Sequence, residues 1–201
     1  MRKSFVPGAI RCIDQVCTAE SVRADGIVAF SAVLTEERYA DGELHNADLR
    51  RINGRLQRRH QRAGIPLVFA GVDISYNEDS EGRWAPHWQL QVYGICVSVD
   101  MTELRIRLAR LYQANDTTPK PLRVRECENL AKALSYMIKP YFGRRVSYRD
   151  RIGRFTTLKV RLKRPQAQEL ATWIDQYPLT ARYALTGCRR YGDRSNPRKD
   201  E

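Results

Sequence analysis

Two short segments each combine a polar face with an apolar one. Side chains alternate between faces along a strand, so His87 and Gln89 share one side of the segment from 85 to 92, and the opposite side is apolar. The segment from 68 to 76 repeats the pattern, with Asp73 on its polar side. An imidazole, an amide and a carboxylate together form a ligand set suited to a divalent cation.

These side chains meet only if a hairpin joins the two strands in a suitable register. The stretch from Asn77 to Arg83 is polar, contains Gly82 and is typical of a hairpin loop. If this loop is centred near Ser80, Asp73 lies opposite His87, and the three candidate ligands converge on one sheet face. A histidine on an edge strand that binds nothing would show the same local pattern.

A tyrosine between two lysines is the second feature that could do chemistry. The segment from about Cys127 to Lys139 has helical spacing and ends before Pro140. Lys132, Tyr136 and Lys139 fall on one face of this helix, away from an apolar stripe formed by Leu130, Ala133, Leu134, Met137 and Ile138. Two ammonium groups would favour the phenolate form of the tyrosine and bind a phosphate that it attacks. A surface tyrosine with no chemical role fits the same spacing.

The charge of the chain points to a polyanion as its partner. Lys and Arg number 35 against 23 Asp and Glu, which gives a formal charge of +12, and nucleic acid is the natural ligand of such a protein. A predicted helix from 46 to 63 carries six arginines, including Arg55 and Arg59. A predicted strand from 158 to 163 would turn Leu158, Val160 and Leu162 to the core and Lys159, Arg161 and Lys163 to a phosphate backbone. A solvated edge strand guarded by lysines has the same pattern.

The remaining elements must hold these groups in place. We expect a lead-in arm over 1–25, one domain over 26–188 with a basic extension from about 143, and a flexible tail over 189–201. Patterning predicts a buried first strand (26–35), the arginine-rich helix, the strand pair, a helix (101–113), a strand (122–126), the tyrosine helix and a last helix (166–176). The fold class is therefore α+β.

The location is predicted from what the sequence lacks. No apolar run is long enough to span a bilayer and no signal-peptide core follows the first residues. The five cysteines lack metal-site spacing, which is typical of reduced thiols in a cytoplasm. We expect a cytoplasmic protein with no membrane partner.

Four sequence blocks, in this order, resemble the motifs of a known family: FSAVLT (30–35), GVDISYN (71–77), EGRWAPHWQLQVYGI (81–95) and LAKALSYMIKP (130–140). The family is that of HUH-type rolling-circle replication initiators, with their relatives among relaxases and single-strand transposases. APHWQ is similar to the metal motif, with Gln89 where bacterial members usually carry His. The segment from Tyr136 to Lys139 is similar to the YxxK nucleophile motif, and the resemblance covers about residues 27–142.

The resemblance implies a ferredoxin-like or RRM-like antiparallel sheet backed by helices. It implies that His87 and Gln89 bind Mg²⁺ or Mn²⁺, with Asp73 as third ligand or, as alternatives, the loop carboxylates Glu78, Asp79 and Glu81. Tyr136 would attack a scissile phosphate to leave a 5′-phosphotyrosine and a free 3′-hydroxyl, and Lys139 would stabilise the developing charge or manage the proton of the phenol. Tyr141, which follows the helix, is an alternative second nucleophile.

The implied function is site-specific nicking and strand transfer of single-stranded DNA that initiates rolling-circle replication of a plasmid or phage. The partner would be single-stranded DNA or an origin hairpin. No Gly-x4-Gly-Lys-Ser/Thr motif occurs, so a host helicase would supply unwinding. A transposase with the same chemistry is an alternative, and so is a non-catalytic RRM-like nucleic-acid-binding protein.

Overall fold

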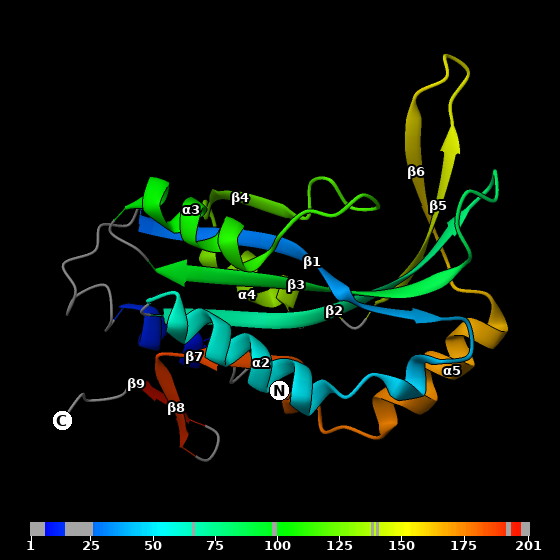
Figure 1. The fold of residues 1–201 in the computed structure, drawn as a ribbon. Coiled ribbons are helices and arrows are strands. Elements are labelled where there is room, and N and C mark those ends of the chain that lie inside the picture. The colour runs from blue at the N-terminus through cyan, green and yellow to red at the C-terminus, as the bar shows by residue number, and fades with distance from the viewer. Residues whose placement is uncertain are drawn as a thin grey trace.

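A long, strongly curled mixed sheet forms the centre of the computed structural model, which describes residues 7–14, 26–65, 67–97, 100–137, 139, 141–191 and 194–197 (Figure 1). Seven strands make up this sheet, in the order β4-β1-β3-β2-β5-β6 with β7 also paired to β2. They are β1 (Ile27–Ala40), β2 (Leu67–Asp79), β3 (His87–Val97), β4 (Leu122–Glu126), β5 (Gly143–Arg149), β6 (Phe155–Val160) and β7 (Tyr183–Thr186).

Strand β2 has two different partners along one of its edges. Within the series β4-β1-β3-β2, each strand is antiparallel to the next, whereas β5 runs parallel to β2. β7 pairs with β2 from Val68 to Gly71 and β5 pairs with it from Ser75 to Asp79. The sheet therefore splits around residues 72–74 of β2, and the β5–β6 hairpin projects away from the rest (Figure 1).

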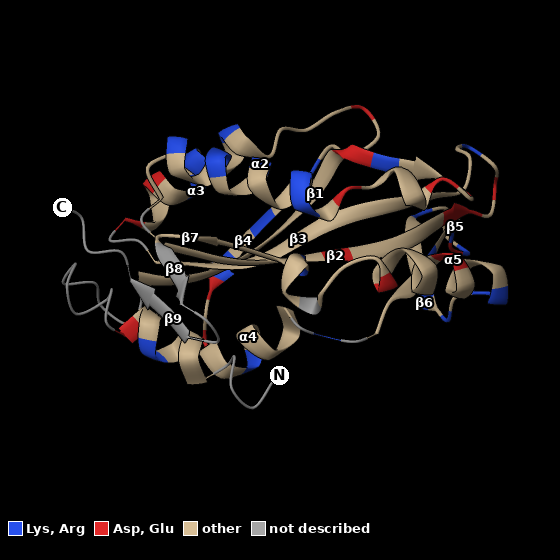
Figure 2. Cartoon of the chain, turned by 90° about the horizontal axis from the view of Figure 1, so that it is seen from below, with Lys and Arg blue, Asp and Glu red and all other residues tan. Residues whose placement is uncertain are grey.

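Helices cover the two faces of the sheet unequally. α2 (Leu49–Arg62) and α3 (Met101–Leu111) lie on one side and α4 (Leu130–Met137) lies on the other (Figure 2). Further helical elements are α5 (Arg164–Asp175) and the short 3-10 turns η2 (Leu44–Asn46) and η3 (Leu179–Arg182). The larger core, on the α2 side, includes the predicted apolar residues Val72, Ile74, Tyr76, Trp88, Leu90 and Val92. The smaller core joins α4 and a helix over 7–14 to the other face.

The predicted α+β class and most of the predicted elements are confirmed. α2 begins after Asp48, whose side chain accepts hydrogen bonds from two backbone amides of the first turn. β1 runs on to Ala40, past its predicted end, and α4 begins at Leu130 rather than near Cys127. Each helix within the described ranges is too short or too polar to cross a membrane.

Three segments differ from the sequence-based expectation. Residues 7–14 of the predicted lead-in arm form a helix, and Ala9, Cys12 and Ile13 are buried in the smaller core. The tail that we expected to be flexible contains two paired strands, β8 (Cys188–Tyr191) and β9 (Arg194–Pro197). The remainder of the arm and of the tail lies outside the described residues.

The prediction that Leu158 faces the core is wrong. Its side chain is 53% exposed, because β6 is the outer strand of a hairpin that extends beyond the body of the sheet. Val160 and Leu162 are half-buried, nearer to the body. Lys159 on β6 is exposed, as expected, and so are Arg161 and Lys163, which follow the end of the strand at Val160.

A buried histidine makes the stability of the fold depend on pH. His60 on α2 is fully buried, and its Nε2 lies 2.8 Å from the hydroxyl of Tyr112. Burial, with a smaller contribution from Arg59, lowers the pKa of His60 from 6.5 to about 4. The unfolded chain therefore binds a proton before the folded protein does.

We predict that stability is highest above pH 6.5 and falls as the pH drops toward 4, by up to about 3 kcal/mol from this group alone. Urea unfolding at pH 7.5 and pH 5 measures the loss, and a His60→Gln variant should show a smaller pH dependence. An equal dependence in both proteins would assign the effect to other groups.

Candidate functional site: a polar sheet face beside α4

The sheet side that carries α4 has a continuous polar surface, which we call the polar face. Its members on β2 and β3 are Asp73, Ser75, Asn77, His87, Gln89 and Gln91, which pair across the two strands. Paired residues point to the same side of a sheet, so the predicted common face of Asp73, His87 and Gln89 is confirmed. Arg145 and Lys159 extend the polar face onto β5 and β6, and Arg123 and Arg125 extend it onto β4.

The predicted register of the β2–β3 hairpin is wrong. Asp73 lies opposite Gln91, and the partner of His87 is Asn77. The turn is centred near Gly82, which has a φ of 68°, rather than near Ser80. At about 3.3 Å per residue, the four positions from Gln91 to His87 separate Asp73 from His87 by about 13 Å along the sheet. Asp73 and His87 are too far apart in this register to bind one ion.

Asp73 is instead joined to the tyrosine helix. Lys139 Nζ donates a hydrogen bond to Asp73 Oδ2 at 2.6 Å and lies 3.4 Å from the hydroxyl oxygen of Tyr136. The ring of Tyr136 packs edge-on against that of Tyr93 on β3, with 4.8 Å between centroids. We call Asp73, Tyr93, Tyr136 and Lys139 the tyrosine cluster. These contacts hold the Tyr136 side chain, which is 46% exposed, beside the polar face.

The carboxylate of Asp73 lies near a second cation. Arg182 is buried where the sheet splits, and its guanidinium donates to the carbonyl of Val72 at 3.4 Å. Burial lowers the pKa of Arg182, and its neighbours Tyr183 and Asp73 partly offset that effect. The ion pair of Asp73 with Lys139 gives a carboxylate at this position a role without a metal ion.

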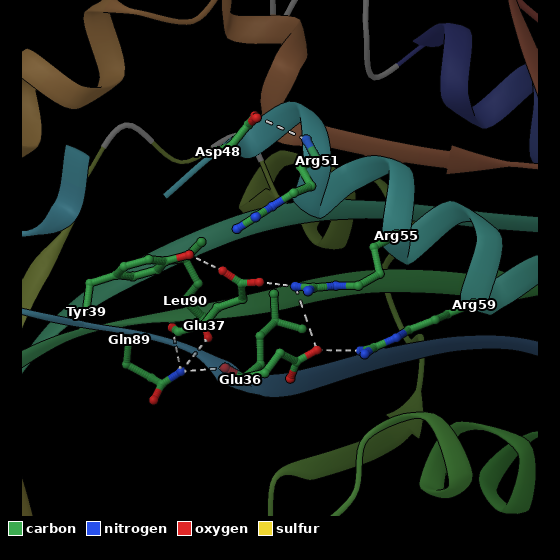
Figure 3. Close-up of polar contacts among 10 residues, drawn as sticks. Glu36, Glu37, Tyr39, Asp48, Arg51, Arg55, Arg59, Gln89 and Leu90 are labelled. Carbon is green, nitrogen blue, oxygen red and sulfur yellow. Dashed lines mark hydrogen bonds and ion pairs between the residues drawn. The ribbon is translucent and has the colours of Figure 1, made fainter. Parts of the chain in front are cut away.

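His87 and Gln89 are each oriented by bonds to backbone carbonyls. The Nδ1 of His87 lies 3.0 Å from the carbonyl oxygen of Ala85, and if Nδ1 carries the proton, Nε2 is left to accept a ligand. Gln89 Nε2 donates to the carbonyls of Leu34, Glu37 and Leu90. Figure 3 shows its amide oxygen turned away from them. Burial, with a smaller effect of Arg38, lowers the pKa of His87 and so favours the neutral ring that can bind a metal.

Two of the three carbonyls that hold Gln89, those of Leu34 and Glu37, belong to an irregularity in β1. The pairing of β1 with β3 shifts between Val33 and Arg38, and Glu37 at this bulge is buried. Its carboxylate accepts hydrogen bonds from Arg55 and from the hydroxyl of Tyr39 (Figure 3). Burial and this carboxylate raise the pKa of Tyr39. The network fixes the bulge from the α2 side and, through its carbonyls, the amide of Gln89.

Two predicted DNA-binding residues, Arg55 and Arg59, belong to the same network. Arg55 forms ion pairs with Glu37 and Glu36, and Arg59 pairs with Glu36. Both side chains are therefore engaged within the protein. Among the other predicted DNA-binding residues, Lys132, Lys159 and Arg161 are exposed, and Lys163 lies 3.4 Å from Glu78.

The side chains of His87 and Gln89 offer a divalent cation two oriented neutral donors. The described residues contain no group of three His, Cys, Asp or Glu side chains placed to hold a metal. The alternative third ligands are engaged with arginines: Glu78 with Arg144, Asp79 with Arg83, and Glu81 with Arg83 and Arg149. His87 Nε2 and Gln89 Oε1 are the donors that fit an ion, and Asn77, directly opposite His87, is the nearest side chain in register that could add an oxygen.

Sequence reasoning missed several residues of this surface. Arg145 donates to Gln91, and Gln91 donates to Ser75. Tyr93 accepts a hydrogen bond from Arg125 on the far strand β4. The odd-numbered alternation of β3 and β4 could have revealed Tyr93 and Arg125, whereas Arg145 depends on the parallel pairing of β5, which no local pattern indicated.

One glycine sets the position of the tyrosine helix. A Cβ atom built on Gly71 would lie 2.9 Å from the carbonyl oxygen of Met137, at the end of α4. We predict that Gly71→Ala displaces this end and lowers stability by about 1–3 kcal/mol. Urea unfolding measures the loss.

Gly54→Ala on α2 is the control for this variant, because the atom nearest to its new Cβ is the flexible end of Arg58. It should retain the stability of the parent. Unchanged stability in Gly71→Ala would show that the end of α4 moves aside without cost.

No known protein family, curated protein or solved structure matches this chain.

Proposed function

We propose that this protein is an HUH-type endonuclease that nicks single-stranded DNA and transfers the strand through Tyr136, as an initiator of rolling-circle replication. The observation that carries the proposal is the tyrosine cluster. A partly exposed tyrosine hydroxyl lies 3.4 Å from a lysine ammonium, on the sheet face that also presents His87 and Gln89. Residues far apart in the sequence, which the motif resemblance had linked, thus share one surface.

The strand topology supports the finer fold assignment. The order β1-α2-β2-β3-α3-β4, with antiparallel strands arranged 4-1-3-2 and both helices on one side, is the arrangement that we would expect of a ferredoxin-like fold. α4 then follows β4 and packs on the opposite side. We propose that this βαββαβ unit is the endonuclease core and that β5, β6 and α5 are additions to it.

The chemistry follows from the groups present. The oxygen of Tyr136 forms a bond to the scissile phosphorus, and the bond from phosphorus to the 3′-oxygen breaks. The tyrosine loses its proton and the 3′-oxygen gains one, which leaves a 5′-phosphotyrosine and a 3′-hydroxyl. Lys139, held by Asp73, stabilises negative charge on the phenolic oxygen and the phosphate. The covalent link conserves the bond energy for resealing.

We propose that His87 and Gln89 hold the Mg²⁺ or Mn²⁺ ion, which would neutralise charge on the non-bridging phosphate oxygens. The phosphate of the DNA and Asn77 are the candidates for further ligands. Asp73 was expected to be the third metal ligand. We propose instead that it holds Lys139. Arg145 and Lys159, beside Asn77 on the same face, would bind neighbouring phosphates.

The test is a denaturing gel of the full-length protein after incubation with labelled single-stranded DNA fragments from a candidate origin and Mn²⁺. We expect a covalent protein–DNA band and a released fragment with a free 3′-hydroxyl. Tight DNA binding without an adduct under Mg²⁺ or Mn²⁺ would instead favour the RRM-like binding protein. A transposase would give the same adduct and would be distinguished by strand joining at element ends.

A further inference from the structure

An aromatic and guanidinium cluster lies at the far end of the polar face, where two hairpins meet. The guanidinium carbons of Arg83 and Arg149 lie 3.8 and 4.2 Å from the ring centroid of Phe155, and that of Arg83 is also 4.8 Å from the ring of Trp84. We call these four residues the tip cluster. Phe155 remains 56% exposed despite these contacts.

The hydrogen bonds of Arg83 show that it serves as a planar surface more than as a phosphate ligand. Its Nε and Nη2 donate to the two carboxylate oxygens of Asp79, and its backbone amide donates to the same side chain. This charge-assisted pairing raises the pKa of Arg83 and lowers that of Asp79 to about 2. The guanidinium is thus held against the rings of Phe155 and Trp84, and its charge is already paired with that of Asp79.

The two hairpins form one unit at this point. Arg149 on β5 forms an ion pair with Glu81 of the β2–β3 turn at 3.3 Å, and Ser80 donates its backbone amide to the carbonyl of Ser147. Arg149 and Phe155 of the tip cluster lie on paired strands, and these contacts join the turn that carries Arg83 and Trp84 to β5. An exposed aromatic ring in a fixed position is a surface on which a flat ligand can stack without ordering the protein.

The surroundings of the tip cluster indicate which flat ligand fits. Phe155, Thr157 and Lys159 alternate along β6 on the same side as Arg149, Ser147 and Arg145 of β5. Arg145 in turn bonds to Gln91, which pairs with Asp73 of the tyrosine cluster. A row of cationic and hydroxyl side chains thus connects the tyrosine cluster to the stacked rings.

We propose that the tip cluster is a subsite for an unpaired nucleobase of a single DNA strand. The base stacks on the exposed ring of Phe155, which Arg83 and Arg149 contact, and phosphates of neighbouring nucleotides bind Arg145 and Lys159. This proposal rests on the proposed single-stranded DNA function and adds a base-contacting site remote from Tyr136. Because every base has a π-face, the subsite favours unpaired bases over paired ones without reading a particular sequence.

Trp84 gives a direct optical test. The chain has three tryptophans, and the other two, Trp88 and Trp173, are buried in the larger core. We expect a thymidine oligodeoxynucleotide to quench the emission of Trp84, and an abasic oligodeoxynucleotide with the same number of phosphates to quench it much less. A Trp84→Phe variant should lose the difference between the two strands.

Affinity measured by anisotropy gives an independent readout. Phe155→Ala is expected to weaken binding of the thymidine strand about tenfold and to leave binding of the abasic strand and the salt dependence unchanged. Ile152→Ala is the matched control, because Ile152 is an exposed apolar residue of the same hairpin, 67% exposed, with no place in the cluster. It should bind both strands as the parent does.

The outcomes separate this proposal from the one on which it rests. If the protein binds DNA and forms the tyrosine adduct, yet Phe155→Ala binds both strands as the parent does and quenching is equal for both, the base subsite is wrong and the nickase proposal stands. Absence of binding to either strand at low salt would overturn both proposals.

Discussion

A Tyr136→Phe variant is expected to bind single-stranded DNA with the affinity of the parent and to form no covalent adduct with it. Phenylalanine keeps the ring packing against Tyr93 and lacks the oxygen that would attack the phosphate. The hydroxyl is on an exposed side chain and its contact with Lys139 is long, at 3.4 Å. Its removal should therefore change the free energy of unfolding by no more than about 0.5 kcal/mol.

Tyr141→Phe is the matched control for this experiment. Tyr141 is also exposed, at 59%, and it lies beyond the end of α4. The control should form the adduct and release the 3′-hydroxyl fragment. An adduct in Tyr136→Phe but not in Tyr141→Phe would move the nucleophile to Tyr141.

The shared face of the candidate site could be predicted because side-chain alternation has a period of two. The true hairpin turn is displaced from Ser80 to Gly82, which changes the partner of His87 from Asp73 to Asn77. A change of partner by an even number of residues leaves every side chain on its original face. The face assignment therefore survived the register error, whereas the ligand set that depended on direct opposition did not.

The contacts that the sequence could not reveal are those between distant segments. Lys139 and Asp73 are separated by 66 residues, and so are Arg144 and Glu78. Arg55 looked like a free cation on the outer face of an amphipathic helix, but a bulge in β1 places Glu37 beneath it. Local periodicity determines which face a residue occupies, and only the assembled sheet determines which charges meet there.

The bulge also affects what a histidine at position 89 would do. An imidazole is a stronger ligand than an amide for a transition metal, so the sequence favours Gln89→His as an active variant with Mn²⁺. In the structure, the amide nitrogen donates to the carbonyls of Leu34, Glu37 and Leu90, and an imidazole cannot replace all of these bonds. The substitution should leave buried carbonyls without donors and destabilise the strand pair.

We expect the cleavage rates of His87 and Asp73 variants to respond differently to the Mn²⁺ concentration. We expect His87→Ala to lower cleavage about a hundredfold at a fixed Mn²⁺ concentration, because it removes the imidazole donor to the proposed ion, and more Mn²⁺ should partly restore the rate. Asp73→Asn should lower the rate through the loss of the ion pair with Lys139. The Mn²⁺ concentration for half-maximal rate should stay unchanged in Asp73→Asn, because Asp73 lies about 13 Å from His87 along the sheet.

The readout is the initial rate of adduct formation across a series of Mn²⁺ concentrations, with DNA binding by anisotropy as the check that each variant is folded. If Asp73→Asn shifts the half-maximal Mn²⁺ concentration as His87→Ala does, then Asp73 is a metal ligand and the two strands adopt another register when DNA is bound. If neither variant changes the titration, the ion required for cleavage binds elsewhere and His87 has a structural role on β3. A shift confined to His87→Ala would assign the ion to His87 and leave Asp73 as the residue that holds Lys139 beside the nucleophile.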